Sequence, residues 1–222
     1  MSGARRCPRS LVCKAHFASC VLASLAPRPS YRLSSTVANL DQKLLLLART
    51  CGHTPTRERA VARFSRLGEH GGVWLAIGTA GGLLNPARRV GWRRARRAVV
   101  GAYVLNTAIK PIAGRRRPQP AGLPALTGTP TGLSFPSAHA STSFAGALAY
   151  SRMGLPAPAV YALASGLALS RLYLGVHHPS DVIAGAALGT VVAGALTGRV
   201  RTADGSLDVA PDAEPFAAQD GR

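Results

Sequence analysis

The sequence predicts an all-α fold, an integral membrane helical bundle of about five membrane helices with an amphipathic helical segment before it. Hydrophobic residues make up 47% of the 222 residues, and charged residues only 16%. The net charge of +18 suits nucleic acid or an anionic membrane surface, and the apolar content favours the membrane. Uncharged stretches carry the expected membrane helices: 71–87, 98–109, 141–151, 153–170 and 182–198.

These uncharged stretches are short for a bilayer. A full span needs ~20 predominantly apolar residues, so the helix ends must recruit polar neighbours. Glycine and alanine are abundant in them, as at 184–189, and small residues allow helices to pack closely in lipid. The same composition would also suit a buried helix of a soluble protein.

The segments outside the expected bundle differ in character. Residues 1–37 are basic and rich in Ser, Pro and Cys; they resemble a poor signal or transit segment and are predicted to be a disordered or misassigned extension. Residues 38–70 carry apolar residues at helical spacing, which predicts amphipathic helices at the membrane interface. The acidic tail, 199–222, is predicted to be disordered.

The arginine-rich segment 88–97 predicts the orientation of the bundle. Loops with excess Lys and Arg near membrane helices tend to stay in the cytoplasm. If 88–97 is a cytoplasmic loop, alternation places loops 110–140 and 171–181 together on the outer face. Lys110 and the arginines at 115–117 then lie on the outer side against the rule, which invites a functional explanation.

The two outer loops carry residue types suited to a phosphate group. Lys110, Arg117 and Arg171 supply cationic donors for phosphate oxygens, and the planar arginine fork can bind two oxygens together. His139 and His177 can move protons or attack phosphorus near neutral pH.

Three blocks in these loops follow a known pattern. They are Lys110, Arg117 and Pro118 (K-x6-R-P); Pro136, Ser137, Ala138 and His139 (P-S-A-H); and Ser170, Arg171, His177 and Asp181 (S-R-x5-H-x3-D). In every spacing, and in all letters but one, they resemble the type 2 phosphatidic acid phosphatase superfamily, the lipid phosphate phosphatases, whose second block reads P-S-G-H. This resemblance makes 71–198 the expected membrane phosphatase domain.

The resemblance implies catalysis without a metal ion or another cofactor. His177 would attack phosphorus and form a phosphohistidine while Asp181 holds its ring. His139 would protonate the departing oxygen and then activate water. The three cations would stabilise charge on the transferring phosphoryl group.

Two helix starts are expected at this site. Pro179 looks like the opening of the last helix, which puts Asp181, the lone acid of a long basic stretch, in its first turn. Ser137 is a plausible N-cap, and backbone amides at Ser137 and Ala138 are expected to bind phosphate. A methyl group at Ala138, where the family has Gly, crowds that approach.

Neighbouring basic residues are assigned lesser roles. His178 stands beside His177 as a rival nucleophile, and the spacing to Arg171 selects His177. Arg115 and Arg116 are predicted to be solvated loop charges that attract anionic headgroups.

The expected partners are a lipid phosphate and the bilayer, with the active site on the extracytoplasmic face of the cell membrane. Residues 132–145 look like small actinobacterial family members, which favours a polyprenyl substrate of the decaprenylphosphoryl-phosphoribose phosphate type. Undecaprenyl diphosphate, phosphatidic acid and phosphatidylglycerol phosphate remain open as substrates.

A vanadium-dependent haloperoxidase and a catalytically silent membrane protein are the alternative functions. No nucleic acid is expected, because aromatics are not interleaved with the basic residues. The oligomeric state stays open.

Overall fold

The computed structural model describes residues 34–198, and every regular element in this range is helical. The elements are α2 (Ser35–Thr50), α3 (Pro55–Arg66), η1 (Glu69–Gly71), α4 (Gly72–Leu84), η2 (Pro86–Arg88), α5 (Arg89–Ala113), α6 (Ala138–Ser151), α7 (Ala157–Tyr173) and α8 (Pro179–Thr197), where η marks short 3₁₀ helices. The prediction of an all-α bundle is confirmed. The predicted tail and residues 1–33 of the predicted extension 1–37 lie outside the described residues, whereas residues 35–37 of that extension are helical and belong to α2.

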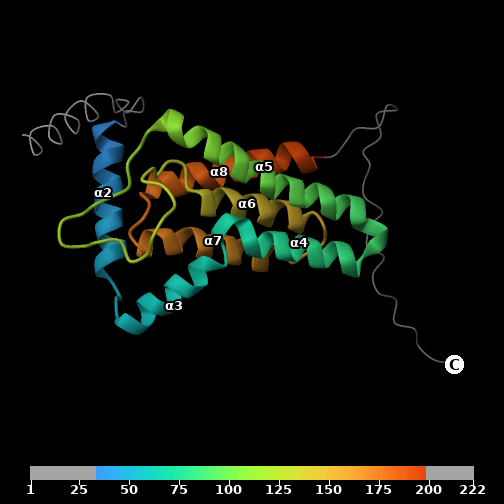
Figure 1. Cartoon of the computed structure of the whole chain (residues 1–222), viewed down its shortest axis with the longest axis horizontal. Helices are drawn as coiled ribbons and strands as arrows, with labels where there is room; N and C mark the ends of the chain where they lie inside the picture. Colours follow the sequence, from blue (N-terminus) through green and yellow to red (C-terminus); the bar gives the residue numbers. More distant parts are fainter. Residues whose placement is uncertain (1–33, 199–222) are drawn as a thin grey trace, which may run out of the picture.

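Helices α4 to α8 run side by side along the long axis of the molecule, and α2 crosses one end of them (Figure 1). Helix α6 lies at the centre and contacts α5, α7 and α8. The loop 114–137 and the turn between α7 and α8 lie at the α2 end, whereas the turn between α4 and α5 lies at the opposite end (Figure 1). The predicted placement of the two outer loops at one end is therefore confirmed.

The prediction that 88–97 is a loop is wrong, because α5 already begins at Arg89. Asn85 and Pro86 begin the short helix η2, which leads directly into α5, and the many arginines nearby made this segment look like a loop. The Asn85 side chain accepts a hydrogen bond from the backbone of Arg88 at 3.3 Å, and proline is favoured at the first helical position. Arginine is a good helix former, so the basic segment continues the helix.

By length and composition, one helix of the described chain, α8, could cross a membrane. Helix α4 has 13 residues, which corresponds to about 20 Å at the rise of an α-helix. The hydrocarbon core of a bilayer is ~30 Å thick. The apolar helices of this chain are thus mostly shorter than a full span.

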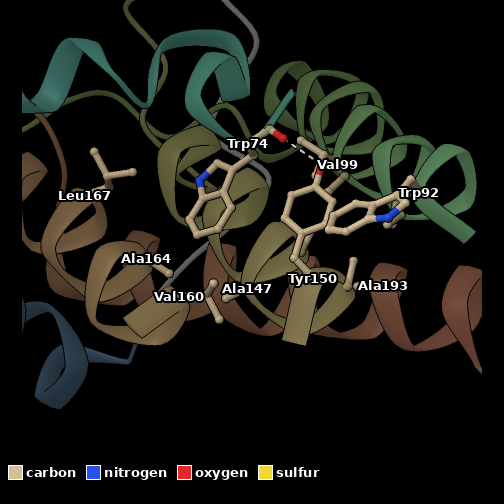
Figure 2. Packing of buried hydrophobic residues seen from close by; sticks show 14 residues of the cluster. Trp74, Trp92, Val99, Ala147, Tyr150, Val160, Ala164, Leu167 and Ala193 are labelled. Carbon is tan, nitrogen blue, oxygen red and sulfur yellow. Dashed lines mark hydrogen bonds between the residues drawn. The ribbon is translucent and has the colours of Figure 1, made fainter. Parts of the chain in front are cut away.

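Buried aromatic side chains fill the core of the bundle (Figure 2). Trp74 and Tyr150 are fully buried, and the Tyr150 hydroxyl donates to the Trp74 carbonyl at 2.6 Å. The Trp74 indole donates to Ser143 at 3.0 Å, and Trp92 packs against Tyr150 with ring centroids 5.7 Å apart. These contacts join α4 and α5 to α6.

Glycines bring the backbones of α6 and α8 into contact. A Cβ on Gly185 would lie 2.5 Å from the Ser137 carbonyl oxygen, and a Cβ on Gly189 would overlap the Ser141 carbonyl. The close packing expected from the glycine and alanine content is thereby confirmed for this pair. It sets the first turns of both helices side by side at the α2 end.

We expect Gly189→Ala to lower the free energy of unfolding in detergent by about 1–3 kcal/mol, because the added methyl group forces α6 and α8 apart. Gly194→Ala is the matched control on the same helix, since no atom lies within 4 Å of its added Cβ. Equal stability of the two variants would contradict the close contact.

Candidate active site

The predicted site residues meet at the α2 end of the bundle. Lys110 lies in the last turn of α5, and its ammonium donates to the Pro136 carbonyl at 2.8 Å. The Ser137 amide donates to the Asp181 carbonyl at 2.9 Å, which joins the start of α6 to the start of α8. Arg117 reaches His177 from the loop that follows α5.

Helix α8 begins at Pro179, as predicted, with Asp181 in its first turn. One carboxylate oxygen of Asp181, Oδ2, accepts the His178 amide at 2.8 Å. The same oxygen lies 3.5 Å from Nδ1 of His177. Asp181 is fully buried and His177 is 3% exposed, so both side chains are shielded from water.

The other ring nitrogen of His177, Nε2, faces a cation. Nη1 of Arg117 lies 3.2 Å from it, and an arginine N–H can only donate, so this contact places a lone pair on Nε2 and the ring proton on Nδ1. Burial lowers the pKa of His177 to about 4, although the neighbouring Asp181 carboxylate opposes the change. The ring is therefore neutral at neutral pH, and Nε2 is a competent nucleophile.

Three buried or half-buried cations line the site without a carboxylate partner. Lys110 and Arg117 donate to backbone carbonyls, and Arg171 donates to the Ser65 hydroxyl at 2.7 Å. Within residues 34–198 none of the three forms an ion pair. Nε of Arg171 is buried and has no hydrogen-bond partner in the described chain. Such uncompensated positive charge favours an anionic ligand.

His139 lies in the first turn of α6, and its Nε2 is 3.0 Å from the Ser65 carbonyl oxygen. A carbonyl only accepts, so this contact places the ring proton on Nε2 and leaves Nδ1 with a lone pair. Ser65, at the end of α3, thus bonds both His139 and Arg171. No sequence motif surrounds Ser65, and it was not anticipated.

Ser137 occupies the N-cap position of α6, as predicted, but its hydroxyl makes no capping bond. The hydroxyl oxygen is buried and has no partner within the described residues. Ala138 is the first residue of α6 and is half-buried. The Ser137 hydroxyl is therefore a further donor that could turn to an anion at the helix start.

The prediction that Arg115 is a solvated charge is wrong. Its guanidinium lies between two carboxylates, 2.7 Å from Asp41 and 2.7 Å from Asp181, and the side chain is 13% exposed. Arg116 is exposed, as expected. No sequence motif links Asp41, in α2, to this loop, although the two lie in direct contact.

A cavity of about 450 Å³ opens beside this site. It is lined by residues of the loop 117–129 together with Gly175 and Val176. Arg117 forms part of its wall and also contacts His177, which does not itself line the cavity. Within the described chain, no group of three or more His, Cys, Asp or Glu side chains gathers that could hold a metal ion.

Comparison with known proteins identifies the family of this chain. The sequence pattern of the PAP2 superfamily matches residues 97–203. A decaprenylphosphoryl-5-phosphoribose phosphatase of Mycolicibacterium smegmatis is 43% identical over 131 residues, which cover 59% of this chain and 70% of that protein. The chain belongs to the PAP2 superfamily. A protein of the same name from Mycobacterium tuberculosis is 43% identical over 135 residues, covering 60% and 75% of the two chains. The predicted resemblance is confirmed.

Two solved structures share the PAP2 fold. The transmembrane PAP2 type phosphatidylglycerolphosphate phosphatase from Bacillus subtilis has a TM-score of 0.61 at 20% identity, covering 84% of this chain and 94% of that one. A bacterial vanadium-dependent iodoperoxidase has a TM-score of 0.62 at 18% identity, covering 78% and 52%. The likeness at these identities concerns the fold alone, which serves both enzyme classes.

Proposed function

We propose that this PAP2 protein is a membrane phosphatase that removes the phosphate monoester from a polyprenyl-linked phosphoribose, the type of substrate that its mycobacterial relatives are named for. The observation that carries the proposal is the His177 ring. Its Nε2 faces Arg117 and its Nδ1 points to Asp181, and, besides burial, the nearby cations Arg117 and Lys110 lower its pKa.

In the proposed reaction, Nε2 of His177 attacks phosphorus, so an N–P bond forms as the P–O bond to the sugar breaks. In the free protein burial and the nearby Arg171 lower the pKa of His139 to about 3; the negative charge of the bound phosphate raises this pKa again, and protonated His139 gives its proton to the departing oxygen. In the second step neutral His139 takes a proton from water, the water oxygen attacks phosphorus, and the N–P bond breaks to release phosphate. Asp181 stabilises the positive charge on His177 while the phosphohistidine exists.

The surroundings of His177 support this chemistry. Lys110, Arg117 and Arg171 would neutralise charge on the oxygens of the transferring group. The first turns of α6 and α8 both face the site, and helix N-termini favour anions. The cavity beside Arg117 is large enough for a sugar ring, which supports a substrate with an organic group next to the phosphate.

We further propose that α4 to α8 lie in the cell membrane as a multi-pass bundle with the catalytic end on the extracytoplasmic face. Helix α8 has the length and composition of a span, and apolar side chains on α5 and α8, such as Val104, Ile183 and Val191, are exposed. The arginine-rich start of α5 lies at the end opposite the site (Figure 1), which suits a cytoplasmic end. Helix α2, with exposed leucines, would lie along the outer interface.

The experiment is to purify the full chain in detergent and measure phosphate release from a panel, with EDTA present. We expect the highest kcat/KM with decaprenylphosphoryl-phosphoribose phosphate, and lower values with undecaprenyl diphosphate, phosphatidic acid and phosphatidylglycerol phosphate. Loss of activity in EDTA would contradict the metal-free mechanism. Halide oxidation with added vanadate and peroxide, without phosphate release, would replace the phosphatase by a haloperoxidase.

A further inference from the structure

Helix α2 presents two different faces. Its buried face carries Asp41, Leu45 and Arg49 at intervals of four residues. The helix crosses the end of the bundle that holds the candidate site (Figure 1), where it contacts α7 and α8. Its opposite face exposes leucines such as Leu40 and Leu47. Residues four apart share one side of a helix, so the position of Asp41 in the sequence aims its carboxylate at the site.

Asp41, although it belongs to α2, caps the N-terminus of α8. Its Oδ1 accepts the Ser180 amide at 2.8 Å, and its Oδ2 accepts the Ser180 hydroxyl at 2.6 Å. The first amides of a helix have no partner within the helix, and a carboxylate there is favoured by the helix dipole. Burial raises the pKa of Asp41, and hydrogen bonds from Ser180 and Arg115 more than offset this, so the pKa falls below its usual value. Asp41 is therefore ionised at neutral pH.

Arg115 links Asp41 to the Asp181 carboxylate. Nη2 of Arg115 donates to Asp41 and Nη1 donates to Oδ1 of Asp181, each at 2.7 Å. The guanidinium is planar and rigid, so fixing one edge fixes the other. Oδ2 of Asp181 is then held toward the His178 amide and His177.

Charge also favours this arrangement. Arg115 is shared by two carboxylates, so only part of its attraction falls on Asp181. Without the Asp41 charge, Arg115 would compete more strongly with the His177 ring for the Asp181 carboxylate, and would add positive charge to a site that is already cationic. Asp41 thus acts on His177 without touching it.

We propose that Asp41 is a positioning residue for the reaction: through Arg115 and Ser180 it fixes the orientation and charge of Asp181 against His177. Asp41 lies outside residues 97–203, the part that matches the family pattern. The inference rests on the proposed phosphatase function and adds to it a helix, α2, whose docking completes the site.

The test is Asp41→Asn in the full chain, which keeps an acceptor for the Ser180 amide and removes the charge that holds Arg115. We expect kcat for phosphate release to fall about 10- to 100-fold with KM nearly unchanged, the usual effect of losing a group that orients a catalytic residue. Asp41→Glu, which retains the charge, should recover part of kcat. Leu45→Ala is the matched control: it removes buried packing one turn along the same face and leaves the ion pairs intact.

A kcat of Asp41→Asn within about two-fold of the parent, or no lower than that of Leu45→Ala, would overturn the positioning role and leave the proposed function standing. A parent protein that releases no phosphate from any lipid would overturn the proposed function itself. If Asp41→Asn fails to fold, Ser180→Ala replaces it, because it removes one donor to Asp41 and keeps both carboxylates; an unchanged kcat there would count equally against the proposal.

Discussion

Replacing His177 by alanine is expected to slow phosphate release by about a thousand-fold or more, because the variant loses the nitrogen that we propose attacks phosphorus. The low pKa of His177, about 4, keeps that nitrogen unprotonated in the parent at neutral pH. The measurement is single-turnover release of labelled phosphate, with alkaline gels that preserve phosphohistidine. The parent should carry the label on the protein during turnover, and the variant should carry none.

The control for this variant is His178→Asn, which changes the neighbouring histidine and retains a good residue for the N-cap of α8. We expect it to keep most of the activity. If His178→Asn is inactive while His177→Ala still transfers the label, the nucleophile has been assigned to the wrong histidine.

Asp181→Asn is expected to lower kcat by about ten-thousand-fold, the size of the loss that the same change causes in serine proteases. The amide nitrogen is a donor, and where it faces Nδ1 of His177 it favours the tautomer with the proton on Nε2. That tautomer has no lone pair on the attacking nitrogen. In that orientation the amide nitrogen also takes the place of Oδ2, the oxygen that accepts the His178 amide, so this bond at the start of α8 is lost as well.

The matched control for this change is Glu58→Gln, which neutralises an acid paired with His53 away from the site. Circular dichroism and thermal unfolding in detergent establish that both variants fold. Activity of Asp181→Asn within ten-fold of the parent would show that the carboxylate is not required to orient His177.

The sequence determined the helices and most of the side chains that meet at the candidate site, because both depend on local signals. Each uncharged stretch corresponds to one helix from α4 to α8, and Pro179 set the start of α8. The three motif blocks identified the cations and histidines through fixed spacings within single loops. The start of α5 was missed because a run of arginines indicates a loop by charge and a helix by propensity.

The tertiary structure alone decided which distant side chains complete the site. Asp41 and Arg115 are 74 residues apart, and His139 bonds a carbonyl at Ser65 that is also 74 residues away. Such contacts follow from how helices pack, and at Gly189 the packing depends on backbone contact that no spacing reveals. The sequence does not distinguish an arginine on the surface from a buried one. The burial of Arg115 between two carboxylates therefore became visible only in the fold.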